Sequence, residues 1–455
     1  MRLIGMLLIG RGMALFLIGV MLVFPQFAQS SNAPNANAHL LTLDVLLVND
    51  PSLPLVTAKD AQKIFSQARL TLEEKFGFSE IEFRIIGEKT SQDFISLHRS
   101  SDPKCLHIFE PFRVSVDPAT AGQLPEAIPK DRVLSFLKRW ELDALRNYFP
   151  PEITKDLKSF DSIYELLISE FRRKLELISK LKLADGEDLV GADSWRHRSY
   201  VNWLCAMRNQ NEADFVLTNA FILFDLGSEP YPHTIFSTNK LGGASLFNWH
   251  REAIKNKAVL ASTFSMVTDI PFFKEEGVET LSAEQRLSVI GTFLVAHELG
   301  HAVFRTPDFY DHPKECLMTT TYETGYVSGY HQINKTPGRC SKCRPYVDAL
   351  RSVFLSRKAA AKENWAEAIA LQKKAIKQTP KHIDGRYARY IVELSARLAR
   401  LYWNQGDLKQ CERWVKAILR VSPSNREALE LKAKLEDSAS RPAVQSDSGP
   451  RTGGR

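Results

Sequence analysis

The stretch His297-Glu298-Leu299-Gly300-His301 places two histidines four residues apart near the end of an amphipathic segment. On a helix, residues at this spacing lie one above the other, so both imidazoles can reach one metal ion. Glu298 would then project beside the metal as a candidate general base. The stretch predicts a zinc site, and zinc-dependent hydrolysis is the leading hypothesis for its chemistry. The alternative is a buried, hydrogen-bonded pair of histidines that holds no metal.

The segment before this stretch predicts the helix that carries it. Ser282 to Gln285 has the form of a capping box, in which the serine and glutamine side chains satisfy free backbone N–H groups. Apolar residues then recur at helical spacing, and the two histidines continue their stripe; these residues are Leu287, Ile290 and Leu294. We therefore expect both histidines to face the interior.

A catalytic zinc takes three protein ligands and leaves one position for water. The third ligand is expected downstream, where the candidates are Asp308, Asp311, His312, Glu315 and Glu323. His312 is preferred, because neutral imidazole suits zinc and a turn at Pro307 would fold the chain back over the site. Glu323 is the third ligand in the alternative, a gluzincin-like hydrolase.

Around the two histidines the chain resembles the metzincin clan of metallopeptidases. The resemblance rests on the histidine pair, a histidine downstream, and Met318 as a candidate Met-turn residue beneath the metal. It implies that Tyr322 or Tyr326 donates a hydrogen bond to the developing oxyanion; the alternative is that both tyrosines merely pack. It also implies that the strand from Ala258 to Phe264 is the sheet edge along which an extended substrate lies.

Within that clan, the cysteines look most like those of the archaemetzincins. Cys316-Leu317-Met318 and Cys340-Ser341-Lys342-Cys343 match a C-x-M and a C-x-x-C pattern. The resemblance implies that these cysteines help to hold a second, structural zinc, for which His331 is a candidate fourth ligand.

The sequence also departs from the clan. Phe304 and Pro307 stand where metzincins have a glycine and the third ligand, so His312 implies an insertion. Pro313 stands where archaemetzincins carry a further cysteine. Without a fourth ligand the three cysteines would bind no second metal.

Residues 1 to 30 are typical of a signal peptide. Arg2 and Arg11 precede an apolar run from Met13 to Phe24, which is short for a membrane span of about 20 residues. We predict an exported protein, periplasmic or secreted, with no stable membrane span after cleavage. The alternative is a membrane anchor formed by the uncleaved N-terminal segment.

Export would offer the cysteines another role, because thiols pair in an oxidising compartment. Cys105 with Cys205, and Cys316 with Cys340 or Cys343, are the expected pairs. For Cys340 and Cys343, disulfide bonds or free thiols are therefore alternatives to the second zinc. Cys411 is expected to be a small, buried apolar residue.

The 455 residues are enough for two or three domains, and 44% of them are hydrophobic. The net charge of +7 is mild, so we expect no nucleic-acid partner. The expected order is a signal peptide (1–30), a flexible lead-in (31–40), a zinc metallopeptidase domain (41–346), a helical region (350–437) and a disordered tail (438–455).

The pattern of the middle region predicts an α+β fold with a mixed β-sheet beside the active-site helix, and the resemblance implies that this sheet is metzincin-like. Strands are expected at Leu41–Val48, Ile81–Ile86, Asp214–Asp225 and Ala258–Phe264, and a helix at Thr57–Phe76. Leu241 to Leu246 is expected to be a loop. Residues 90–210 are interpreted as a helical insertion, with helices at Pro129–Asn147 and Phe160–Leu183.

After residue 350 two blocks resemble tetratricopeptide helical hairpins. The blocks run from Asn364 to Pro380 and from Gly406 to Pro423. Two units seldom stand alone, so we expect them to pack on the catalytic domain or on a protein partner. The alternative is a helical bundle with no recognition role.

These observations predict an exported zinc metallopeptidase that hydrolyses peptide bonds, with a peptide or protein as substrate. A water molecule activated by zinc would attack the peptide, with Glu298 as general base. The alternatives are the gluzincin-like hydrolase and a non-catalytic binding protein, in which the zinc is structural and the helical repeats recognise a partner.

Overall fold

The structure is a computed structural model, and it describes parts of the chain between Leu41 and Ser440. The expected signal peptide, lead-in and C-terminal tail lie outside the described residues. The described ranges are 41–99, 130–138, 142, 155–178, 180–182, 198, 200–210, 212–222, 243–247, 257–270, 273–304, 306, 313, 315–319, 325–335, 340–380 and 386–440.

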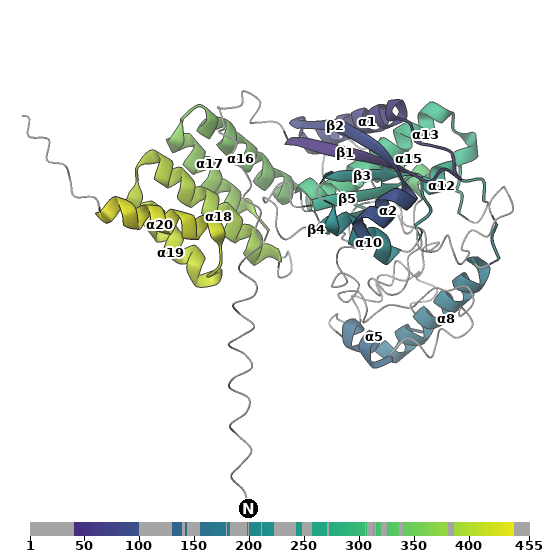
Figure 1. The fold of residues 1–455 in the computed structure, drawn as a ribbon. Coiled ribbons are helices and arrows are strands. Elements are labelled where there is room, and N and C mark those ends of the chain that lie inside the picture. The colour runs from purple at the N-terminus through teal and green to yellow at the C-terminus, as the bar shows by residue number, and fades with distance from the viewer. Residues whose placement is uncertain are drawn as a thin grey trace, which may run out of the picture. The chain divides into compact units, whose positions relative to one another are not determined.

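A five-stranded sheet with the order β2-β1-β3-β5-β4 forms the centre of the first half of the fold (Figure 1). Neighbouring strands run parallel except β4, which is antiparallel to β5. The expected mixed sheet is confirmed, and parallel pairing predominates in it. The strands are β1 (Leu41–Asn49), β2 (Ile81–Thr90), β3 (Phe215–Thr218), β4 (Gly243–Phe247) and β5 (Lys257–Ser262).

Strand β1 is buried on both faces, because consecutive side chains of a strand point to opposite sides of the sheet. Leu43, Val45 and Leu47 belong to the core on one face. Leu46 and Val48 belong to a separate core on the other face. The two cores explain why the sequence of β1 is almost continuously apolar.

Helix α1 (Ala58–Phe76) crosses from β1 to β2 and covers the first face. Thr57 caps it in a capping box with Asp60. It ends at Gly77, whose φ of 62° is the left-handed conformation that glycine favours. The expected helix and both of its ends are therefore confirmed.

Helices α2 (Ser91–Arg99) and α10 (Tyr200–Asn209) contribute the core on the second face. The rings of Phe94 and Trp203 lie 5.6 Å apart between them. The two ends of the segment expected to be an insertion therefore complete the layers of the sheet. Within it, α5 (Lys130–Leu137) and α8 (Phe160–Ile178) are helical as expected.

Two strand expectations need correction. The loop expected from Leu241 to Leu246 is wrong, because these residues overlap β4, whose backbone pairs with β5. The small residues of β4 give little strand signal by themselves, and the pairing with β5 supplies the stability. The strand expected from Asp214 to Asp225 is shorter in the structure, because β3 ends at Thr218. The next residue, Asn219, bonds instead to the backbone after β1, with its Oδ1 accepting from Asp50 N–H at 2.6 Å.

Helix α15 (Tyr326–Ile333) packs on the histidine-bearing helix and is fixed at its C-terminal end by α1. The buried ammonium group of Lys75 donates a hydrogen bond of 2.7 Å to the carbonyl oxygen of Ile333. A positive charge at this end also complements the helix dipole. The contact fixes one end of a helix that contributes a candidate site residue. Two shorter helices, α12 (Phe264–Val267) and the 3₁₀ turn η3 (Val278–Thr280), precede the histidine-bearing helix.

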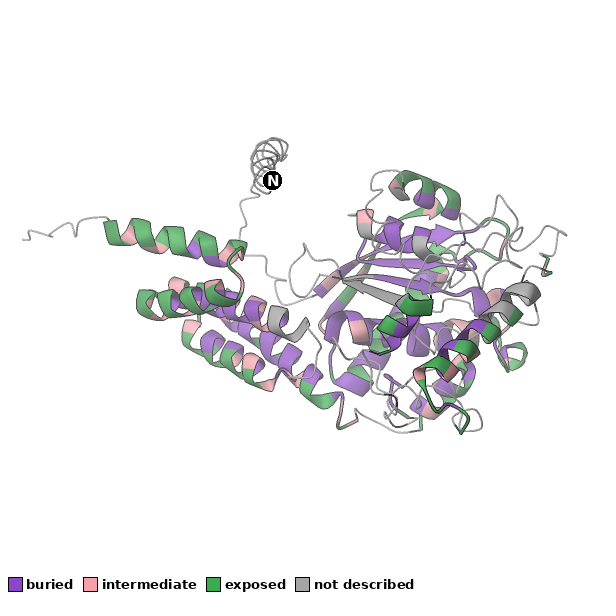
Figure 2. Ribbon diagram, turned by 90° about the horizontal axis from the view of Figure 1, so that it is seen from below, coloured by how far each residue is buried: buried purple, intermediate pink, exposed green. Residues whose placement is uncertain are grey.

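The C-terminal region consists of helices whose buried residues face one another (Figure 2). Asn364 and Asp407 cap the second and fourth of them, each accepting a hydrogen bond from a backbone N–H in the first turn. The expected helical blocks are confirmed as α17 and α19, and three further helices, α16, α18 and α20, surround them. The helices are α16 (Arg344–Ala361), α17 (Trp365–Gln378), α18 (Arg386–Gln405), α19 (Leu408–Val421) and α20 (Arg426–Ser440).

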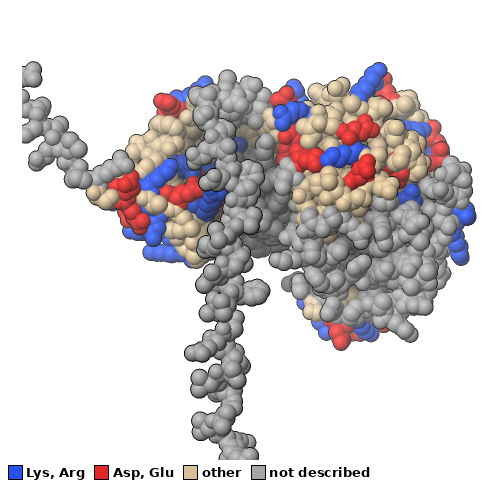
Figure 3. Space-filling view, viewed as in Figure 1, with Lys and Arg blue, Asp and Glu red and all other residues tan. Residues whose placement is uncertain are grey.

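Acidic and basic side chains are interspersed on the face drawn in Figure 3. Several form ion pairs, such as Arg84 with Asp44 at 2.8 Å and Arg400 with Glu427 at 2.7 Å. Exposed pairs of this kind contribute only about 0–1 kcal/mol each. The buried apolar cores on the two faces of the sheet and in the helical region, and not surface charge, therefore hold the fold.

Candidate metal centre

The two histidines lie on one continuous helical segment from Ala283 to Phe304. It begins with the expected capping box, in which Ser282 accepts from Gln285 N–H and Gln285 accepts from Ser282 N–H. The segment consists of α13 (Ala283–Val289), the π-helical turn η4 (Ile290–Val295), α14 (Ala296–Leu299) and the π-helical turn η5 (Gly300–Phe304). The histidine pair thus lies between and within π-helical turns, which frequently occur at functional sites.

This segment is a core helix. Among the described residues it is the one helix long and apolar enough to cross a membrane, and 83% of its most apolar stretch is buried. Burial requires close approach to α1, where a Cβ on Gly291 would lie 2.4 Å from the carbonyl oxygen of Ile64. Glycine at this position lets the two helices pack this closely.

The structure brings the imidazoles of His297 and His301 together. Their Nε2 atoms lie 3.1 Å apart, and the rings meet edge to face with centroids separated by 4.7 Å. His297 is 9% exposed, and the adjacent Glu298 is 7% exposed. His301 is half-buried, so the expectation of an inward-facing pair is met fully by His297 and in part by His301.

The other nitrogen of each ring determines what the pair can bind. His297 Nδ1 lies 2.8 Å from the carbonyl oxygen of Leu317, and His301 Nδ1 lies 2.6 Å from that of Thr306. A carbonyl oxygen can only accept, so each Nδ1 carries a proton and donates. In the neutral rings, both Nε2 atoms then present lone pairs to the same point.

Two lone pairs at this distance repel each other unless a proton or a metal ion lies between them. Nitrogens that share one zinc ion in a tetrahedral site lie about 3.3 Å apart, close to the observed separation. Metal-binding histidines commonly donate their second N–H to a carbonyl group, which fixes the ring and its tautomer. The residues present therefore fit a zinc ion held by His297 and His301.

Met318 lies beneath the same turn of the helix. It is fully buried, and a Cβ on Gly300 would lie 2.1 Å from its Sδ atom. The absence of a side chain on Gly300 makes room for this contact. The contact places Met318 against the turn that precedes His301, and its role beneath a metal stays a prediction.

Tyr326 is the described member of the tyrosine pair expected to donate to the oxyanion. It is the first residue of α15, and its ring lies 6.1 Å from that of Phe293 on the histidine-bearing helix. Burial, followed by the nearby charges of Glu275 and Glu298, raises the pKa of Tyr326 above its usual range. The phenol therefore stays protonated at neutral pH and can donate a hydrogen bond.

Several predicted residues lie outside the described part of the chain. They are Asp308, Asp311, His312, Tyr322 and Glu323. The expectation for the third ligand therefore stays a prediction. Glu315 is described and is exposed.

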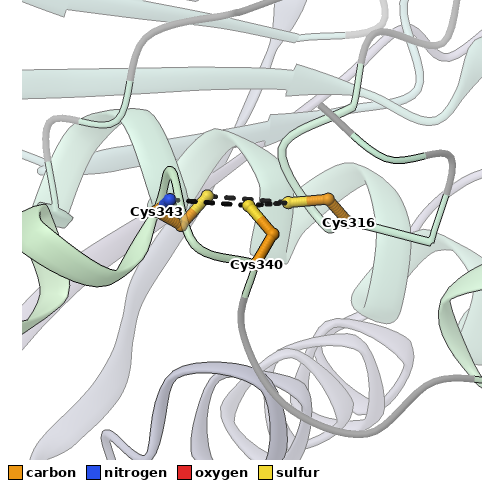
Figure 4. Close-up of side chains that lie close together, drawn as sticks. All are labelled: Cys316, Cys340 and Cys343. Carbon is orange, nitrogen blue, oxygen red and sulfur yellow. Dashed lines mark hydrogen bonds between the residues drawn. The ribbon is translucent and has the colours of Figure 1, made fainter. Parts of the chain in front are cut away.

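Cys316, Cys340 and Cys343 form a second cluster, in which the three sulfur atoms point toward one another (Figure 4). Cys316 Sγ lies 3.3 Å from Cys340 Sγ and 3.5 Å from Cys343 Sγ. Backbone N–H groups of Met318 and Cys343 donate to the sulfurs of Cys316 and Cys340, each at 3.4 Å. None of the three is disulfide-bonded in this structure, so the alternative of a disulfide within the cluster is not formed.

The cluster has most of what a structural zinc needs. Sulfurs around a tetrahedral zinc lie about 3.8 Å apart, slightly farther than the contacts here. His331 is exposed and is not part of the group, so a fourth ligand would have to be another group. Hydrogen bonding with Cys340, together with burial, raises the pKa of Cys316 to about 12, so metal binding would release protons.

The remaining cysteines behave differently from one another. Cys205 is disulfide-bonded, and its expected partner Cys105 lies outside the described residues. Cys411 is free and fully buried in the helical region, as expected for a small apolar residue.

Sequence reasoning missed the carbonyl groups of Leu317 and Thr306 and the buried carboxylate of Glu275. A backbone carbonyl occurs in every residue, so no sequence signal could have identified these two. Glu275 is 6% exposed, and its Oε1 lies so close to Gly325 that a Cβ there would be 2.1 Å away. It lies 22 residues before His297 and outside any motif, so only the tertiary contact places it near the site.

Comparison with known proteins identifies one region of the chain. Residues 359–435 match the tetratricopeptide repeat family. No curated protein and no solved structure matches the chain. The C-terminal helices therefore form a tetratricopeptide repeat region, a kind of structure that generally mediates protein–protein interactions.

Proposed function

We propose that this chain is an exported zinc-dependent metallopeptidase. One observation carries the proposal: the Nε2 atoms of His297 and His301 lie 3.1 Å apart, while both Nδ1 atoms are held by carbonyl groups. This is the arrangement that a shared zinc ion requires. His312 is the proposed third ligand, with Glu323 as the alternative.

A bound zinc ion supplies Lewis acidity, which lowers the pKa of water and polarises a peptide carbonyl group. Glu298, next to the first histidine, accepts the proton of the attacking water and passes it to the leaving amine. The phenol of Tyr326, whose pKa the nearby charge of Glu298 helps to raise, is protonated and donates a hydrogen bond to the developing oxyanion. Together these residues perform general base catalysis and charge stabilisation.

The sheet supports the substrate side of this proposal, with one correction. Strand β5 was expected to be the sheet edge, but β4 lies outside it and ends the sheet in the described part of the chain. A strand with a free edge can pair with the main chain of an extended peptide. We therefore propose β4 in place of β5 as the strand along which a substrate lies.

Export agrees with the disulfide bond of Cys205, because disulfides persist mainly in oxidising compartments. An uncleaved N-terminal segment that anchors the chain in a membrane is the alternative. A second zinc on Cys316, Cys340 and Cys343 belongs to the proposal as a structural site.

The test is the zinc content and peptidase activity of the purified protein. Native protein should hold one zinc, or two if the cysteine cluster is filled, and should cleave a peptide pool. Glu298→Gln should keep the zinc and lose the cleavage, whereas His301→Ala should lose one zinc. His331→Ala, an exposed histidine outside both clusters, is the matched control and should change neither. A folded native protein without zinc would sink the proposal.

The same measurement on two further variants identifies the third ligand. Loss of zinc on His312→Ala but not on Glu323→Ala supports the three-histidine site. The reverse result supports the gluzincin-like alternative.

A second candidate is a non-catalytic protein that binds a partner through its helical repeats, with a structural zinc. The tetratricopeptide repeat match favours it. It predicts a zinc-loaded protein that cleaves no peptide and unfolds when the zinc is removed. The conversion of Glu298 to glutamine would then have no measurable effect.

A further inference from the structure

The cysteine cluster joins two segments that are far apart in sequence. Cys316 lies 24 residues before Cys340 and 27 before Cys343. Cys340 and Cys343 both lie just before α16, and Cys343 is its N-cap residue. The three sulfurs therefore attach the segment around Cys316 to the first turn of that helix.

The attached segment is the one that holds the first histidine. Leu317 follows Cys316 directly, and its carbonyl oxygen accepts from His297 Nδ1–H at 2.8 Å. The next residue, Met318, donates its N–H to Cys316 Sγ at 3.4 Å. The Leu317 carbonyl group thus lies between Cys316, which belongs to the cluster, and Met318, whose N–H contacts it.

Burial in the main core and hydrogen bonds of its own backbone also hold the segment, and Cys316, Leu317 and Met318 all belong to that core. A short turn closes it, with Cys316 N–H donating to Pro313 and Thr319 N–H donating to Cys316, at 2.8 and 3.0 Å. These bonds lie within the segment and do not attach it to another element. The sulfur contacts, together with the packing of Leu317 and Met318 in the main core, provide that attachment.

Helix α16, on the other side of the cluster, is held in place by aromatic packing. Phe354 of α16 packs edge to face on Phe78, with ring centroids 5.0 Å apart, and Phe78 packs on Phe304 at the end of the histidine-bearing helix. Helix α16 then continues into the tetratricopeptide repeat region, which begins at residue 359. One end of the helical region therefore supports the histidine site.

We propose that the cysteine cluster is the positioning device for His297. The sulfurs of Cys340 and Cys343 hold Cys316, and thereby the Leu317 carbonyl, so that His297 keeps its Nδ1–H tautomer and presents Nε2 toward His301. The inference deepens the proposed function and rests on it only for its consequence in metal binding. The three cysteines are positioning residues, because they act on His297 through the Leu317 carbonyl group.

The test compares full-length Cys340→Ser and Cys343→Ser with Cys411→Ser. Cys411 is also buried and free, but lies in the helical region, so its loss controls for general destabilisation. The first readout is the nitrogen and proton NMR signals of the His297 ring in metal-free protein. The second is the dissociation constant for zinc at the histidine pair, followed by the ring signals of His297 and His301.

In native protein and in Cys411→Ser, we expect a single Nδ1–H tautomer for His297 with a slowly exchanging ring proton. In Cys340→Ser and Cys343→Ser, we expect a mixture of tautomers, rapid exchange and zinc binding weakened about 10- to 100-fold, as for other groups that orient metal ligands. Unchanged ring signals and unchanged zinc affinity in both variants would overturn the proposal.

Two features keep the outcome clear. Cys340 is only partly buried, so Cys340→Ser is expected to fold even if Cys343→Ser does not. A native protein that binds no zinc at the histidines would sink the proposed function, but the ring signals of metal-free protein would still test the positioning role. The two failures are therefore distinguishable.

Discussion

The Nε2 atom of His301 lies 3.1 Å from the Nε2 atom of His297, and each ring is held by a backbone carbonyl group on its other side. The pair is preorganised, because the rings need not turn to meet a cation. In neutral rings the two Nε2 lone pairs repel each other, which destabilises the folded state until a cation binds between them. Metal binding should therefore stabilise the folded state.

The first prediction is a thermal shift on zinc binding. At a free zinc concentration 100 times the dissociation constant, the free energy of unfolding should rise by about 2.7 kcal/mol. Differential scanning calorimetry of full-length protein, with zinc and with a chelator, measures the shift. His301→Ala should abolish the part of the shift that comes from the histidine pair, whereas His331→Ala should retain it. An equal shift in both variants would show that the zinc binds elsewhere.

The second prediction concerns the close approach of α1 to the histidine-bearing helix. Gly291→Ala gains about 1 kcal/mol of helix propensity. The new Cβ would meet the Ile64 carbonyl oxygen at 2.4 Å, and a backbone atom within a helix cannot move aside cheaply. Overpacking of this kind costs about 1–3 kcal/mol, so we expect a net loss of stability in urea unfolding.

Gly87→Ala is the matched control for this substitution. Its nearest neighbour, Cδ1 of Leu46, would lie 3.9 Å from the new Cβ, an ordinary contact. We expect a change within about 0.5 kcal/mol. A Gly291→Ala protein as stable as the native one would contradict the packing described for these helices.

The third prediction concerns the start of the same helix. Ser282→Ala removes the hydroxyl that accepts from Gln285 N–H, and loss of such a cap costs about 1 kcal/mol. Urea unfolding followed by circular dichroism measures the change. Ser288→Ala, in the same helix, loses only a bond to the Glu284 carbonyl oxygen and should change stability by less than about 0.5 kcal/mol. Equal effects would mean that the cap contributes nothing.

The fourth prediction is a pH dependence that comes from His98. Its side chain is 12% exposed, and burial lowers the pKa of His98. Glu212, 3.4 Å away, partly opposes this effect, while Lys89, paired with the same carboxylate, adds to it. The folded protein therefore binds a proton at His98 less readily than the unfolded chain does.

The sign of the effect follows from that difference. Stability from this group is fully present above the unfolded pKa of about 6.5 and is lost as the pH falls through the lower, folded pKa. NMR titration of the ring should give a midpoint below 6.5, and His98→Gln should lose less stability than the native protein on acidification from pH 7. A ring that titrates above 6.5 would contradict the prediction.

Much of the local structure could be read from the sequence, because its signals lie within one element. The capping boxes at Thr57 and Ser282, the helical spacing of His297 and His301, and the helical blocks after Asn364 all depend on residues a few positions apart. Helix geometry fixes what such residues can do, whatever surrounds them. The candidate metal pair and the repeat region therefore followed from the sequence.

The tertiary structure alone decided the features that depend on segments brought together from far apart. The residues of β4 did not predict a strand, because the pairing of their backbone with β5 is what makes this segment a strand. The carbonyl groups of Leu317 and Thr306 fix the histidine tautomers, yet every residue carries a carbonyl group and none is marked in the sequence. Cys316 meets Cys340 and Cys343 only because the fold places α16 beside the loop that carries Leu317. Local periodicity determines which side chains share a face, and long-range packing determines what that face meets.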